Sequence, residues 1–140
     1  MDETKITKLT EKINRYLEYL EVERNVSRYT VRNYRHYLYK FASWINQKYG
    51  DIVLAKIDVE KVRQFRLFLN RYVGAGNLPL KRVTQSYYLI ALRSFLKWLI
   101  KNDEPALAPE KIELPKTESR SLKFLTKQQM EQLLGQPKIS

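Results

Sequence analysis

The side chains best suited to chemistry in this sequence are basic, and they gather on two predicted helices. At about 100° per residue, Arg28, Arg32 and Arg35 fall along one face of a helix that begins near Ser27. A later helix has a single strip that is not fully apolar, which holds Arg82, Ser86, Arg93 and Lys97. Arginine and lysine bind phosphates and guanine edges, so two such strips suit the surface of a nucleic-acid duplex.

Short polar side chains accompany these bases, and amides and hydroxyls suit adenine edges and phosphates. We therefore expect duplex contacts from two groups of residues. The earlier helix supplies Arg28, Thr30, Arg32, Asn33 and Arg35. The later helix supplies Lys81, Arg82, Gln85, Arg93 and Lys97. Ser27 is expected to cap its helix rather than to contact a phosphate.

The distribution of charge supports a polyanionic partner. The chain has 26 Lys and Arg against 15 Asp and Glu, a formal charge of +11. No acidic residue lies between Arg24 and Gly50 or between Lys61 and Asn102. Helices that only need solubility usually mix charges, because Glu–Lys pairs one turn apart stabilise them. In the two stretches without acidic residues the positive charges repel one another, and this repulsion is tolerable where a bound polyanion offsets it. A merely basic, well-solvated surface is the alternative.

Most catalytic chemistry is excluded by composition. The chain has no Cys, a single His at position 36 and 4 Gly, none of them in a phosphate-binding loop motif. Thiolate metal sites, cysteine nucleophiles and paired histidines are therefore absent. We expect no cofactor, no metal and no catalytic residue in this chain. His36 is interpreted as a satisfied or solvent-facing side chain.

Apolar residues at three- and four-residue steps predict an all-α chain. A first helix covers residues 4–23, with Ile6 on its apolar face, and a second runs from Ser27 to its end at Gly50. Asp58 caps a third, and a turn over residues 74–79 precedes a fourth helix over residues 80–102. The fourth is apolar on most of its circumference, which places it in the middle of a small bundle.

Aromatic residues are interpreted mainly as packing groups. Of the 10 tyrosines, Tyr34, Tyr87 and Tyr88 lie at core positions of their helices, whereas Tyr29, Tyr37 and Tyr39 are freer. Exposed aromatics stack on single-stranded bases, so that mode of binding stays open. Membrane binding is less consistent with the pattern, because the apolar faces are needed for the bundle core.

The last third of the chain changes character. Pro105, Pro109 and Pro115 predict an extended linker over residues 103–120. Thr126 then caps a short helical start. We expect a helical domain over 1–102, the linker over 103–120, and the start of a truncated second domain over 121–140. The N-terminus is polar and no apolar run is long enough to cross a bilayer, which favours a cytoplasmic protein.

Four segments in order resemble the tyrosine recombinases of the phage integrase and Xer type. Residues 26–45 resemble their S-x-x-T-x-x-x-Y-x-x-x-L-x-x-F-x-x-W signature, and 92–99 their L-R-x-F-x-x-[FW]-L helix. Residues 104–116 resemble the interdomain linker, and 124–134 the start of the catalytic domain. Glu104 and Gln129 depart from the usual Asn and Glu.

The resemblance implies a SAM-like core-binding domain: a four-helix bundle of orthogonal helical hairpins that forms half of a C-shaped clamp on duplex DNA. It places the second and fourth helices toward the major groove. In this family a Tyr nucleophile, with Arg, His and Lys, belongs to the C-terminal domain, so none of the tyrosines here takes that role. Arg120 and Lys123 come too early to be catalytic.

The expected function is a DNA-binding module of a site-specific recombinase or integrase, with no enzymatic activity of its own. Lys116 and Arg120 would follow the DNA backbone across the linker. The resemblance implies further recombinase protomers on DNA for the full-length protein, and the isolated domain is expected to be monomeric. The alternative is a helical protein-interaction bundle that docks an acidic partner; an enzyme with unrecognised chemistry is a third.

Overall fold

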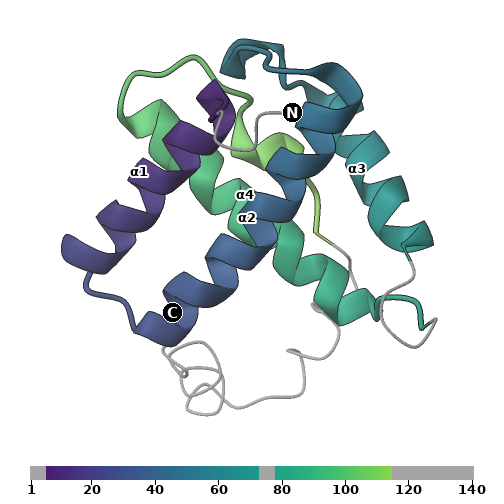
Figure 1. Cartoon of the computed structure of the whole chain (residues 1–140), viewed down its shortest axis with the longest axis horizontal. Helices are drawn as coiled ribbons and strands as arrows, with labels where there is room; N and C mark the ends of the chain where they lie inside the picture. The colour runs from purple at the N-terminus through teal and green to yellow at the C-terminus, as the bar shows by residue number, and fades with distance from the viewer. Residues whose placement is uncertain (1–5, 73–77, 115–140) are drawn as a thin grey trace.

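The computed structural model describes residues 6–72 and 78–114. The helices in this part are α1 (Lys8–Val22), α2 (Arg28–Tyr49), α3 (Val59–Arg71) and α4 (Arg82–Lys101), with two 3₁₀ turns, η1 (Leu54–Lys56) and η3 (Pro109–Lys111). α2 crosses in front of α4, with α1 and α3 on either side (Figure 1). The predicted all-α, four-helix class is confirmed.

Side-chain caps set where the first three helices begin. The Ser27 hydroxyl accepts from the Thr30 amide at 3.1 Å, and Asp58 Oδ1 accepts from the Lys61 amide at 3.0 Å, as the sequence predicted. α1 begins later than expected, because Thr7 is its N-cap. Ile6 therefore precedes the helix and is 61% exposed, so its assignment to the apolar face was wrong.

One core joins all four helices. The predicted apolar faces of α1 and α2 are buried apart from Ile6 and the half-buried Tyr34, and aromatic rings connect the elements. Phe41 of α2 meets Phe65 of α3 edge to face, with ring centroids 4.9 Å apart, and Tyr16 of α1 lies 5.6 Å from Phe95 of α4. Gly50 ends α2 at φ 85°, a left-handed conformation that glycine adopts without strain.

The first turns of α4 are covered on one side only. Tyr88 packs there against Tyr37 of α2, with ring centroids 4.8 Å apart. Its neighbour Tyr87 is turned by about 100° and is 45% exposed, so its predicted core position was wrong. Val83, on the same part of the helix, is also exposed, at 38%. Ser86, expected among the bases, is buried and donates to the Arg82 carbonyl oxygen at 3.2 Å.

Residues 103–114 lie on the bundle. Asp103 takes a left-handed φ of 63°, and the Glu104 amide donates to the Leu99 carbonyl at 2.9 Å, which reverses the chain after α4. The segment is non-helical outside η3, as the prolines predicted. It is nevertheless packed, since Ile112 is 2% exposed and belongs to the core. We call residues 103–114 the return segment.

Three side chains, each from a different helix, hold the return segment. Lys12 of α1 pairs with Glu104 at 2.7 Å. Arg93 of α4 donates from Nε to the Pro109 carbonyl oxygen at 3.2 Å. Arg66 of α3 donates from Nη1 to the Glu113 carbonyl oxygen at 2.8 Å. The segment is therefore attached across the bundle rather than at the end of α4 alone.

Candidate nucleic-acid interface

The row of arginines on α2 forms as the sequence predicted. Arg28, Arg32 and Arg35 are all exposed. The Arg32 guanidinium lies over the Tyr29 ring, 5.3 Å from its centroid, and this cation–π contact orients it. Two other predicted residues of this helix are less accessible: Thr30 is 3% exposed and Asn33 is half-buried.

The crossing of α2 and α4 decides which basic residues lie together. At mid-helix, His36 Nε2 is 3.1 Å from the Tyr88 hydroxyl, near the start of α4. The first half of α2 lies beside the second half of α4, where Thr30 and Lys97 line one cavity. Lys97 thus lies beside the first half of α2, although none of Arg28, Arg32 and Arg35 lines that cavity.

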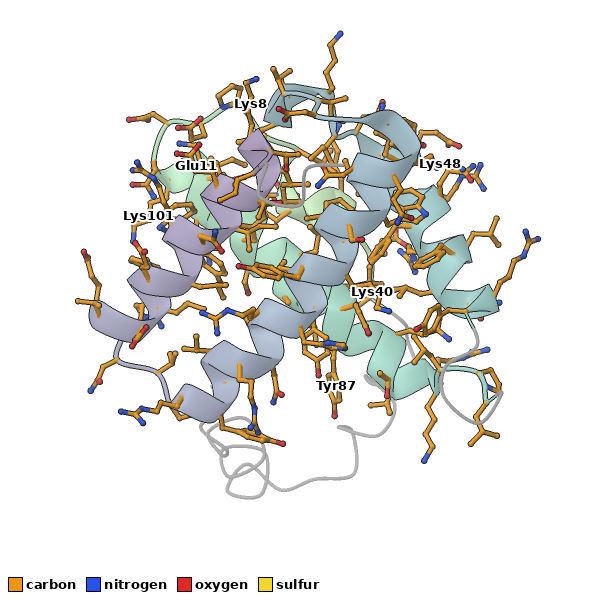
Figure 2. All side chains as sticks on the ribbon, viewed as in Figure 1. Lys8, Glu11, Lys40, Lys48, Tyr87 and Lys101 are labelled. Carbon is orange, nitrogen blue, oxygen red and sulfur yellow. The ribbon has the colours of Figure 1, made fainter. Side chains whose placement is uncertain are left out.

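The predicted strip on α4 divides into two ends. Lys81 and Arg82 are exposed at the start of the helix. At a rise of 1.5 Å per residue, Arg82 is about 22 Å from Lys97 along the axis. Tyr87 lies near the first end and points away from the bundle (Figure 2). A long, gently curved ligand could contact both ends, whereas a compact one could reach only one.

Two predicted residues of α4 have partners within the protein. Arg93 is half-buried and bonds to Pro109 of the return segment. Gln85 donates from Nε2 to the Leu80 carbonyl oxygen at 3.2 Å. Lys116 and Arg120, the other two predicted contacts, lie outside the described residues.

The cations of α2 and α4 take no carboxylate partner within residues 6–72 and 78–114. The ion pairs there are Lys12–Glu104, Lys61–Asp58 and Arg63–Glu60. All three involve α1 or α3. Neither α2 nor α4 contains an acidic residue. Within the described residues, their positive charge is therefore not offset by carboxylates.

Aromatic side chains contact two further cations of α2, which point away from the face of Arg28, Arg32 and Arg35. Lys40 Nζ lies 4.0 Å from the Tyr72 ring centroid, and Lys48 Nζ lies 5.8 Å from that of Trp44. Burial and the nearby Lys40 lower the pKa of His36, which keeps its imidazole neutral at physiological pH. His36 is exposed and hydrogen-bonded to the Tyr88 hydroxyl, which agrees with its interpretation as a satisfied or solvent-facing side chain.

The sequence analysis did not predict a cavity with basic residues in its lining. A cavity of about 250 Å³ lies between α1, the first half of α2 and the second half of α4, and Arg24, Ser94 and Lys101 help to line it with Lys97. The spacing of Lys97 and Lys101 on one helix could have indicated the pair. Arg24 could not be placed, because its position depends on the turn after α1, where Asn25 has φ 54°.

The described part of the chain contains neither a cluster of metal ligands nor a membrane-spanning helix. No group of three or more His, Cys, Asp or Glu side chains there could hold a metal ion. None of its helices is long and apolar enough to span a membrane.

Comparison with known proteins gives a consistent result. Residues 13–103 match the family described as phage integrase, N-terminal SAM-like domain. The chain is 31% identical over 126 residues to the tyrosine recombinase XerC of Bacillus subtilis, a match that covers 89% of this chain and 39% of that protein. It is 33% identical over 131 residues to XerC of Escherichia coli, covering 92% and 41%.

A solved structure shares the fold. It is the N-terminal domain of a phage integrase/site-specific recombinase from Haloarcula marismortui, with a TM-score of 0.66 at 17% sequence identity. The match covers 78% of this chain and 97% of that one. The chain spans only 39% to 41% of the length of these two recombinases.

Proposed function

The chain belongs to the family of phage integrase N-terminal SAM-like domains, and from that premise we propose that it is the part of a site-specific recombinase that holds duplex DNA. The observation that carries the proposal is the charge of α2 and α4. Both helices lack acidic residues, and their cations take no carboxylate partner in the described part of the chain. When such a positively charged surface binds DNA, counterions are released from the DNA, and their release contributes favourably to the free energy of binding.

The proposed contacts come from both helices. Exposed cations of α2 and Lys97 bind backbone phosphates on one side, and Lys81 and Arg82 bind them at the other end of α4. Asn33 is proposed to contact base edges through its amide, and Gln85 through its amide oxygen, since Gln85 Nε2 donates to the Leu80 carbonyl oxygen. Lys116 and Arg120 are also proposed to contact the DNA backbone.

The relatives are tyrosine recombinases by name, and we propose strand exchange between DNA sites as the activity of the longer protein. In this proposal the bundle grips the recombination site, and the breaking and joining of strands belongs to sequence outside the described residues. Further copies of the protein on the same DNA would complete the reaction.

A salt series tests the proposal. Fluorescence anisotropy of the chain on a duplex of about 30 base pairs should give a log K that falls with log salt, with a slope corresponding to roughly four to eight phosphate contacts. The double variant Arg28→Gln/Arg32→Gln should lower that slope by about two.

The matched control removes two charges elsewhere. Lys8 and Lys56 are exposed and lie outside the proposed contacts, so Lys8→Gln/Lys56→Gln should leave the slope nearly unchanged. If both double variants lose the same amount of salt slope, duplex binding depends on the overall positive charge and not on the proposed contacts. No binding at low salt would favour an acidic protein as the partner of these helices.

A further inference from the structure

The cavity between α1, α2 and α4 has a basic rim and a floor of hydroxyl groups. Arg24, Lys97 and Lys101 line it and are exposed. Tyr16, only 3% exposed, lies at the bottom. Figure 2 shows Lys101 on the α1 side of the molecule. The three cations come from the end of α1 and the last turns of α4, so the folded bundle brings them together.

Among the described residues, none of those that line the cavity is acidic. None of the three rim cations has an ion pair within the described ranges, where every such pair involves other lysines or arginines. A neighbouring cavity differs: it also includes Lys101, but Glu18, Glu23 and Glu104 line it. Like charges around one small volume repel, and an anion between them removes that cost.

The floor offers neutral hydroxyl groups. Ser94 hydrogen-bonds with the phenols of both Tyr16 and Tyr34. Burial raises the pKa of both tyrosines, so their hydroxyls stay protonated at neutral pH. Hydroxyl donors below and cations above are the groups that bind a phosphate in proteins.

We propose that this cavity binds a phosphate group, held by Arg24, Lys97 and Lys101 above the hydroxyls of Tyr34 and Ser94. A cavity of about 250 Å³ has room for a tetrahedral oxyanion together with several water molecules, each of which occupies about 30 Å³ in the liquid. The source is either the backbone of a bound duplex or free phosphate. Only the first source rests on the proposed function.

The first experiment uses inorganic phosphate and no DNA. Phosphate is added to the whole chain at constant ionic strength, with chloride as the balancing ion, and the amide signals of Ser94 and Lys97 are followed by NMR. They should shift and saturate. Lys97→Gln/Lys101→Gln should weaken the binding by about tenfold or more. Lys8→Gln/Lys56→Gln, with the same loss of charge, should bind like the wild type. Circular dichroism checks that each variant is folded.

The second experiment identifies the source. The salt series uses Arg24→Gln/Lys101→Gln, because Lys97 is already a proposed DNA contact. If a backbone phosphate enters the cavity, the salt slope on duplex falls by about one to two in this variant and not in the control. An unchanged slope with lost phosphate binding assigns the cavity to free phosphate. If wild type, variants and control respond alike in both experiments, the proposal is overturned. A wild type that binds no duplex contradicts the proposed function alone, since the phosphate titration still reports on the cavity.

Discussion

Arg93 and Pro109 are joined by a hydrogen bond from the guanidinium Nε to the carbonyl oxygen, 3.2 Å long. The bond ties the middle of α4 to the return segment that follows the helix. An arginine that sequence alone assigned to DNA thus has a partner inside the protein. Lys97, one turn later, is exposed and lines the basic cavity. Two basic residues one turn apart on α4 therefore have different roles: Arg93 holds the return segment, and Lys97 lines the cavity.

Replacing Arg93 should loosen the return segment. Arg93→Gln removes the bond to Pro109 and should lower the free energy of unfolding by about 1 kcal/mol. Exchange of the Ile112 amide hydrogen, which bonds to the Pro109 carbonyl oxygen at 3.0 Å, should become faster. Urea unfolding and hydrogen exchange measure the two effects. Lys97→Gln is the control and should change neither; equal effects in both variants would remove the special role of Arg93.

The packing of the return segment depends on Ile112. Its side chain is 2% exposed, so Ile112→Ala should cost about 2–4 kcal/mol of stability through lost burial and the cavity left behind. Val53, at 45% exposed, supplies the comparison, and Val53→Ala should stay within about 0.5 kcal/mol. A similar small loss at both positions, measured by urea unfolding, would mean that the segment is not packed in solution.

Variants of Ser27 distinguish a helix-capping role from a DNA contact. Ser27→Ala removes the acceptor for the Thr30 amide and should cost about 1 kcal/mol of stability. The salt slope on duplex should stay the same, because a cap makes no phosphate contact. Ser27→Asp keeps the cap but places a negative charge beside Arg28, so stability should recover while duplex binding weakens. A reduced salt slope in Ser27→Ala at full stability would instead make Ser27 a contact.

His36 should make stability sensitive to mildly acidic pH. Burial and Lys40 hold its pKa in the folded protein below the ordinary 6.5. As pH falls below 6.5, the unfolded chain takes up the proton first, so the melting temperature should decrease. Thermal unfolding between about pH 7.5 and pH 5.5 measures the effect, and His36→Gln should reduce it. An equal decrease in wild type and His36→Gln would assign it to other groups.

The periodic parts of the fold were predictable from the sequence. Ser27, Gly50 and Asp58 carry local signals that fix helix ends, and the stripes of α1 and α2 show which faces are buried. The start of α1 was misjudged because Thr7 competes with earlier positions as the cap. Tyr87 was misjudged because periodicity gives the direction of a side chain but not whether another helix covers it.

The basic site was only partly predictable. Arg28, Arg32 and Arg35 of α2 lie on one face because a single helix fixes their angles. Arg93 could not be assigned, since its partner is a carbonyl of a proline-containing segment whose path over α4 depends on tertiary packing. The grouping of Arg24 with Lys97 likewise depends on the turn between α1 and α2, which no local pattern specifies.

The attachment of residues 103–114 has a mechanical consequence. Tension applied beyond Leu114 meets Arg66 of α3 first, then the buried Ile112, and only afterwards Arg93 of α4. The force would reach the bundle through the contacts of Arg66, Ile112 and Arg93, which resist it together. It would not unwind α4 turn by turn from its end at Lys101. A force on Leu114 is thus transmitted first to the side of the bundle that carries α3.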